Sequence, residues 1–161
     1  MNRRTDRVVG ALGFLGSVLV LRLLAGSHPG PFVTDEAGYL GNARWLAGTG
    51  GRWLMDTSPF YRWGYSVLLV PTQWLTDDPA SQFRLVTAVN LALLGALFPI
   101  LYTLLRRTLD PPPWVAAVAA GVAVAAPGVG ASSGMAMAEN LLLPLFALAV
   151  LAFLSLSLIH I

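Results

Sequence analysis

The sequence predicts an all-α membrane protein: a polytopic transmembrane helix bundle of about four spans, with interfacial helices in its first outer loop. Three observations support this fold class: 56% of the 161 residues are hydrophobic, only 11% are charged, and the mean hydropathy is +0.68. A soluble domain usually has about 25% charged residues. All ten basic residues are arginine, and a net charge of +2 gives no indication of nucleic-acid binding. The chain has no cysteine, so neither a disulfide framework nor a thiolate site is expected.

Four apolar runs are long enough to cross a bilayer, which requires about 20 helical residues. They comprise residues 8–25, 83–105, 114–131 and 141–161. The third run is weakened by Pro127. A fifth apolar stretch, residues 60–75, is interrupted by Arg62 and Pro71, so we expect it to form an interfacial or re-entrant helix rather than a span.

The arginines predict how the spans are oriented. Three precede the first run and two follow the second, namely Arg3, Arg4, Arg7, Arg106 and Arg107. Loops rich in arginine stay in the cytoplasm, and two spans between the clusters place both clusters on that side. The prediction is a multi-pass protein of the cell membrane with a cytoplasmic N-terminus. Its outer loop covers residues 26–82, an inner turn covers 106–113, and a short outer turn covers 132–139.

The outer loop is predicted to contain a surface helix over residues 34–48. Thr34 is a suitable N-cap, and Asp35 and Glu36 occupy the first turn, where the helix dipole favours negative charge. Helical spacing gives the segment one apolar face, made by Tyr39, Leu40, Ala43, Leu46 and Ala47. Gly48 is expected to end the helix. Its acidic end would lie beside the first span.

With these motifs the chain resembles the N-terminal part of GT-C glycosyltransferases, among them the protein O-mannosyltransferases and the aminoarabinose and mannosyl transferases that use polyprenyl-phosphate sugars. The resemblance rests on residues 34–39 (TDEAGY), residues 64–71 (GYSVLLVP), Arg84, Asn90, the pair 106–107 and residues 138–140 (AEN). By this resemblance, residues 1–161 form a single transmembrane region that corresponds to the front third or less of a typical family member. We therefore expect an N-terminal fragment that is inactive alone.

The resemblance implies a transfer reaction at the outer membrane face. Asp35 would be the general base that deprotonates a hydroxyl acceptor on a protein, lipid or glycan, and the anomeric carbon would invert as lipid phosphate leaves. Glu36 would orient Asp35 or bind a metal. Proposed substrate-binding residues are Arg52, Arg62 and Arg84 for the phosphate, Tyr65 for the sugar or lipid, and Glu139 at the second outer boundary. The departing phosphate needs stabilisation by a cation, either arginine or a divalent metal, and the resemblance implies no other cofactor.

Other interpretations of the same residues stay open. The acids can simply decorate a helix N-terminus, and the loop aromatics can form an interfacial belt against membrane lipids. A transporter or flippase would need charges or broken helices at mid-membrane depth, for which Asn90 and Pro127 are the candidates. A non-catalytic membrane scaffold would tolerate the loss of Asp35.

Overall fold

The computed structural model describes residues 3–25, 34–50 and 63–157. Its helices are α1 (Arg3–Leu24), α2 (Thr34–Leu46), α4 (Trp63–Leu75), α5 (Pro79–Gly95), α6 (Leu97–Thr108), α7 (Pro113–Val124), α8 (Pro127–Ser133) and α9 (Glu139–Ser157). No strand occurs among the described residues, which confirms the prediction of an all-α bundle.

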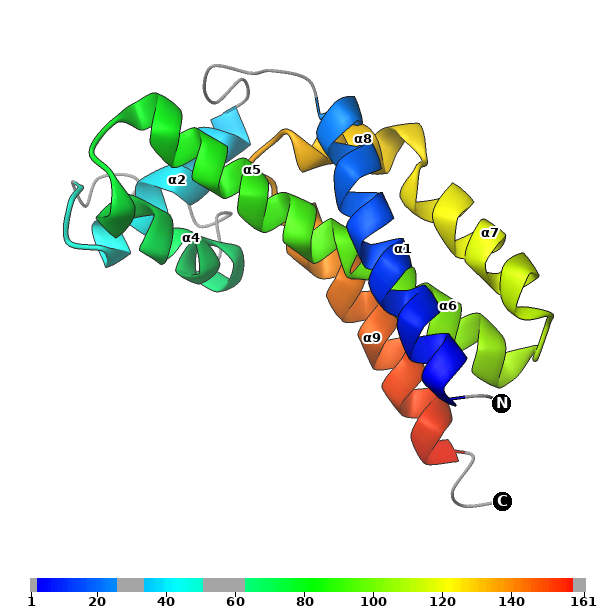
Figure 1. The fold of residues 1–161 in the computed structure, drawn as a ribbon. Coiled ribbons are helices and arrows are strands. Elements are labelled where there is room, and N and C mark those ends of the chain that lie inside the picture. The colour runs from blue at the N-terminus through cyan, green and yellow to red at the C-terminus, as the bar shows by residue number, and fades with distance from the viewer. Residues whose placement is uncertain (1–2, 26–33, 51–62, 158–161) are drawn as a thin grey trace.

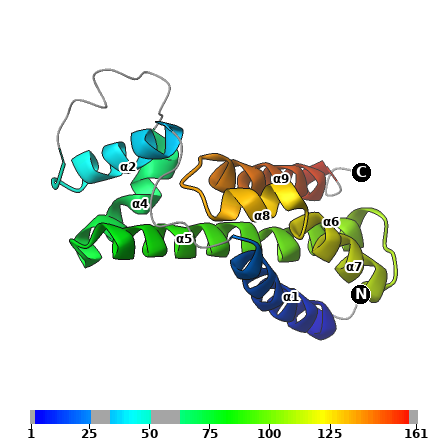
Figure 2. The same ribbon diagram turned by 90° about the horizontal axis from the view of Figure 1, so that it is seen from above.

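Helices α5 and α6 follow each other end to end and form the central rod of the bundle (Figure 1). Helices α1 and α7 pack against α6 and against each other, while α9 lies along the rod and contacts both α5 and α6. Figure 2 shows the rod from above, with α1 and α9 on opposite sides of it. Asp78 starts the rod, because its carboxylate accepts a 2.9 Å hydrogen bond from the Ser81 N–H and Pro79 follows at the first helical position.

Among the residues that the structure describes, three helices are long and apolar enough to cross a membrane. They are Arg4–Leu24, the continuous rod Pro79–Thr108, and Glu139–Leu156. The predicted third span is not one straight helix: α7 and α8 are bent by 57° at a break and make a fourth span only if taken together. The break follows from Pro127, because the residue before a proline is driven out of the helical region, and Ala126 has a ψ of 136°.

The surfaces of these helices suit a lipid environment. Large apolar side chains point outward along α1 and α9; Leu19 is 67% exposed and Phe146 is 73% exposed. Soluble monomers rarely expose contiguous apolar faces of this kind. The chain is therefore built as a membrane protein, and its described part has three or four helices that could cross the bilayer.

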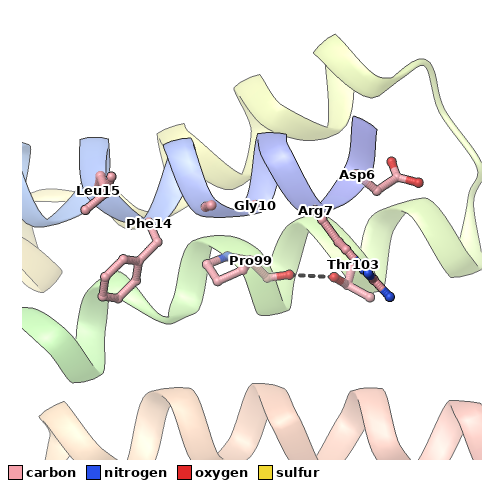
Figure 3. Close-up of a pocket in the computed structure, with 8 residues that line it drawn as sticks. Asp6, Arg7, Gly10, Phe14, Leu15, Pro99 and Thr103 are labelled. Atoms are coloured by element: carbon pink, nitrogen blue, oxygen red, sulfur yellow. Dashed lines mark hydrogen bonds between the residues drawn. The ribbon is translucent and has the colours of Figure 1, made fainter. Parts of the chain in front are cut away.

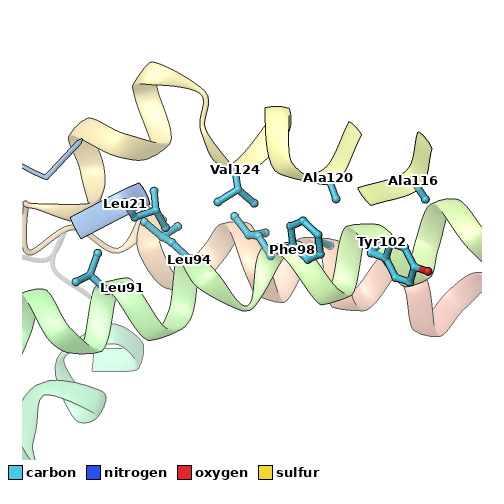
Figure 4. Close-up of a cluster of buried hydrophobic side chains, with 10 residues drawn as sticks. Leu21, Leu91, Leu94, Phe98, Tyr102, Ala116, Ala120 and Val124 are labelled. Atoms are coloured by element: carbon cyan, nitrogen blue, oxygen red, sulfur yellow. The ribbon is translucent and has the colours of Figure 1, made fainter. Parts of the chain in front are cut away.

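The core of the bundle lies where α1, α7 and α9 meet the rod, and Figure 4 shows its side chains. Phe98 and Tyr102 stack with their ring centroids 6.3 Å apart. Helix α1 approaches closely because Gly13 faces the Phe98 ring, where a Cβ atom would lie 1.8 Å from a ring carbon. Small residues at such crossings let membrane helices pack without a hydrophobic driving force between them.

The two arginine-rich segments meet at one end of the bundle, as predicted. Asp6 of α1 accepts a 2.7 Å hydrogen bond from the Tyr102 hydroxyl and lies 3.6 Å from the Arg106 guanidinium. Arg106 also pairs with Asp110 at 2.8 Å. Arg106 is thus largely buried and links α6 to α1 through its ion pair with Asp6. Which face of the membrane this end of the bundle occupies stays a prediction.

Helices α2 and α4 pack together at the opposite end of the rod, where α4 contacts α5. The rod has 30 residues and is about 45 Å long, whereas the hydrocarbon core of a bilayer is about 30 Å thick. A rod of this length exceeds the hydrocarbon thickness unless it is tilted, and α2 and α4 pack at one end of it. Helix α4, within the predicted interfacial stretch, is not among the candidate spans.

Candidate functional site

Helix α2 brings the acidic pair to the edge of the bundle. Its described part begins at Thr34, and the preceding residues lie outside the described ranges, so the cap by Thr34 stays a prediction. It ends as predicted at Gly48, whose φ of +77° is in the left-handed region that glycine adopts without strain. The Thr49 N–H then donates to the Arg44 carbonyl at 2.9 Å, and the Gly48 N–H donates to the Trp45 carbonyl at 3.0 Å. This pair of bonds is a Schellman cap.

The two neighbouring carboxylates have different environments. Glu36 is 1% exposed, whereas Asp35 is exposed at the start of the same helix. Glu36 accepts a 2.8 Å hydrogen bond from the buried Ala136 N–H, in the turn that joins α8 to α9. A buried carboxylate requires hydrogen-bond partners of this kind. Glu36 therefore fastens α2 to the segment that precedes α9, and Asp35 is left facing outward.

The predicted apolar face of α2 is only partly right. Leu40 and Ala43 are buried as expected, but Leu46 is half-buried, and Glu36 and Asn42 share the buried side. The helix turns Glu36 toward the bundle because the Ala136 N–H there donates a hydrogen bond to its carboxylate. Hydrophobic spacing by itself could not reveal that partner.

Two buried asparagines hold the same turn between α8 and α9. Asn90 of α5 donates to the Met135 carbonyl at 2.7 Å and to the Ser133 carbonyl at 3.3 Å. Asn140 of α9 donates to the Met135 carbonyl at 2.8 Å and to the Ser132 carbonyl at 2.9 Å. These bonds satisfy buried backbone carbonyls that the broken helix leaves without helical partners. The turn is thus fixed by α5, α9 and, through Glu36, by α2.

Tyr65 of α4 completes this buried network. Its hydroxyl donates a 2.6 Å hydrogen bond to Asn90 Oδ1, and its ring packs edge-on against Tyr39 with the centroids 5.5 Å apart. Burial raises the pKa of Tyr65 well above its ordinary value of 10.0. The phenol therefore stays protonated and continues to donate at physiological pH.

An apolar groove of about 420 Å³ adjoins the network. Its lining comes from α4, α5, α6 and α9 and comprises Leu68, Val89, Ala92, Leu93, Ala96, Ile100, Leu141, Pro144, Leu145 and Leu148. Three of these residues, Val89, Leu93 and Leu141, also pack against the cluster that contains Tyr65 and Ala136. The groove therefore runs along the membrane-embedded part of the bundle from the level of the buried network.

The structure places the other predicted site residues as follows. Arg84 is exposed on α5, 3.9 Å from Asp78, and donates to the Ser81 hydroxyl at 3.1 Å. Glu139 is exposed at the start of α9, and it is the adjacent Asn140, fully buried, that joins the network. Arg52 and Arg62 lie outside the described residues.

The sequence signals were unequal for these residues. Asn90 stands out as a polar residue within an apolar run, but the role of Asn140 depends on the turn between α8 and α9 and has no local signature. The described residues contain no group of three or more His, Asp or Glu side chains that could hold a metal ion. Their donor set does not fit a metal centre, and no step below passes through one.

Comparison of the chain with models of known protein families, with curated proteins and with solved structures gives no match. The geometry of the described residues is therefore the basis for the function proposed next.

Proposed function

We propose that the chain forms part of a membrane glycosyltransferase, which transfers a sugar from a polyprenyl-phosphate donor to a hydroxyl acceptor. The main support is the division of labour between two adjacent carboxylates. Glu36 is fixed in the buried network, and Asp35 is presented to the outside by the same helix turn. A catalytic carboxylate needs a rigid support and an open face, and this arrangement supplies both.

In the proposed reaction Asp35 is the general base. Its carboxylate takes the proton of the acceptor hydroxyl while the hydroxyl oxygen attacks the anomeric carbon. The bond from that carbon to the phosphate oxygen breaks, the electron pair stays on the departing polyprenyl phosphate, and the anomeric configuration inverts. Glu36 acts through position: its bond to the Ala136 N–H holds α2 against the bundle. Arg84 offers an exposed positive charge at the same end of the rod for the phosphate.

The apolar groove gives the donor's lipid chain a place in the same scheme. Its walls are aliphatic side chains of α4, α5, α6 and α9, which match an isoprenoid chain in polarity. Because Val89 and Leu141 belong both to the groove and to the cluster beside Tyr65, a chain in the groove would bring its phosphate end toward α2.

The proposal is tested by measuring sugar transfer in membranes from cells that express the full open reading frame encoding these residues. We would supply radiolabelled polyprenyl-phosphate sugars and compare wild type with Asp35→Asn at matched expression. We expect a loss of about 10²- to 10⁴-fold, the usual contribution of a general base. Asp77→Asn is the matched control, since Asp77 is another exposed acid at this end of the molecule. Unchanged transfer by Asp35→Asn, or no transfer by wild type with any donor, would refute the proposal.

One observation favours a transporter or flippase as a second candidate. The third apolar run is broken by 57° between α7 and α8, the buried Asn90 bonds the carbonyl of Ser133 at the last residue of α8, and broken helices are a feature of transport sites. That candidate predicts movement of lipid-linked sugar across the bilayer without its transfer to an acceptor. Measuring both products in the same vesicles separates the two functions.

The proposed orientation places the arginine-rich end in the cytoplasm and α2 and α4 outside. Because the chain has no cysteine, single cysteines can report the topology directly. Asp77→Cys should react with a membrane-impermeant maleimide in intact cells, whereas Thr108→Cys should react only after permeabilisation. The opposite pattern would invert the topology and remove Asp35 from the outer face.

A further inference from the structure

A second groove lies between α1 and α6 at the arginine-rich end, away from α2 and the buried network. It measures about 550 Å³ and is lined by Asp6, Arg7, Gly10, Ala11, Phe14, Leu15, Pro99 and Thr103. Figure 3 shows it in close-up. The proposed function uses none of these residues.

The groove changes in polarity along its length. Its polar residues lie near the end of the bundle where the α1 N-terminus meets the last turns of α6. Toward the middle of α1 the lining is apolar, with Phe14 and Leu15. Gly10 is buried beside Pro99, and a Cβ atom there would lie 3.6 Å from the Pro99 Cβ, in ordinary van der Waals contact. A bilayer lipid has the same order, with a charged headgroup at the surface and an acyl chain below it.

The charge at the polar end is positive. Arg7 is exposed and makes no hydrogen bond or ion pair with any residue that the structure describes. Its side chain extends along α6 toward Thr103 (Figure 3), and Asp6 also lines the groove. Asp6 is already engaged by the Tyr102 hydroxyl at 2.7 Å and by Arg106 at 3.6 Å. Asp6 Oδ1 is thus held within the bundle by Tyr102 and Arg106, and Arg7 is the cation of the groove lining that no described residue pairs with.

We propose that this groove is a binding site for an anionic phospholipid. The Arg7 guanidinium holds the headgroup phosphate, and one acyl chain lies over Gly10 toward Phe14 and Leu15. Arginine recognises phosphate through paired N–H donors, and basic pockets between membrane helices are suited to acidic headgroups. The site is separate from the donor groove and independent of the proposed transfer reaction.

The test measures lipid binding to the purified chain in detergent by native mass spectrometry, with phosphatidylglycerol and phosphatidylcholine as probes. Wild type should bind phosphatidylglycerol about five- to tenfold more tightly than phosphatidylcholine, and Arg7→Gln should lose that preference. Ala11→Trp should weaken both lipids, because Ala11 is exposed and a larger side chain there fills the groove without overpacking the helices. Arg22→Gln, an exposed arginine at the other end of α1, is the matched control and should bind as wild type does.

Several outcomes would overturn the site. Equal binding of the two lipids by wild type would show that the site does not recognise the headgroup charge. Wild-type affinity for phosphatidylglycerol in Arg7→Gln would show that Arg7 does not hold the phosphate. Displacement of phosphatidylglycerol by glycerol 3-phosphate at equal concentration would indicate a soluble anion in place of a lipid. Circular dichroism and gel filtration of each variant ensure that a lost preference is not a lost fold.

Discussion

Replacing Glu36 by alanine should destabilise the fold through one buried contact. The substitution removes the acceptor of the 2.8 Å hydrogen bond from the Ala136 N–H, in a turn where Ala136 is 0% exposed. Alanine has no acceptor at that position, so the Ala136 N–H loses its hydrogen-bond partner. The cost therefore includes the desolvation of a stranded donor as well as the bond itself.

The hydrogen bond to the Ala136 N–H sets the scale of the loss. A hydrogen bond to a charged group contributes about 1.5–3 kcal/mol, so we expect Glu36→Ala to lose about 2 kcal/mol of unfolding free energy. For a chain of this length, that corresponds to a fall in Tm of about 4–8 °C. Glu36→Gln keeps an oxygen acceptor at the same place and should recover most of the loss.

The assay is thermal unfolding of detergent-purified variants followed by far-UV circular dichroism. Asp35→Asn is the matched control, because Asp35 is exposed and a surface substitution changes stability by about 0.5 kcal/mol or less. The reasoning is refuted if Glu36→Ala melts within about 1 °C of wild type, or if Asp35→Asn is as unstable as Glu36→Ala. Either result would mean that Glu36 does not anchor α2.

Three further predictions concern the bundle and its caps. Gly13→Ala should lower the unfolding free energy by about 1–3 kcal/mol, because its Cβ would lie 1.8 Å from the Phe98 ring. Gly16→Ala is the control and should melt as wild type does, since nothing lies within 4 Å of a Cβ there. Equal melting temperatures for the two variants would contradict the packing. Tyr65→Phe should cost about 1 kcal/mol for the lost donor. Since burial raises the pKa of Tyr65, its stabilisation is present below pH 10.0 and lost only as pH rises through the higher folded value. Phenolate absorbance from Tyr65 near pH 10.0, read as wild type minus Tyr65→Phe, would argue against its burial. Hydrogen bonds from Ser81 lower the pKa of Asp78 below its usual 3.8. Wild type should therefore be more stable than Asp78→Asn at neutral pH, and the difference in stability should shrink as pH falls below 3.8. A difference that grows at low pH would contradict this prediction.

Local chemistry allowed part of this fold to be predicted without any structure. Membrane-length apolar runs predict spans because an unsatisfied backbone in lipid is costly, so each run must be helical. Gly48 and the pair Asp78 and Pro79 mark helix ends through their own backbone preferences. The acidic pair could be placed on a helix N-terminus for the same reason. These signals act over a few residues, and the sequence contains them whole.

Contacts between distant residues could not be predicted in this way. Asp35 and Glu36 are consecutive acids about 100° apart around a helix, and only the position of Ala136, 100 residues later, determines which one is buried. Likewise, Asp6 and Arg106 read as separate charges until α1 and α6 bring them together. The sequence by itself determined which segments are helical and apolar enough to enter a membrane. The tertiary structure alone decided which polar groups meet inside, because a buried polar group is stabilised by partners that the chain supplies from another helix.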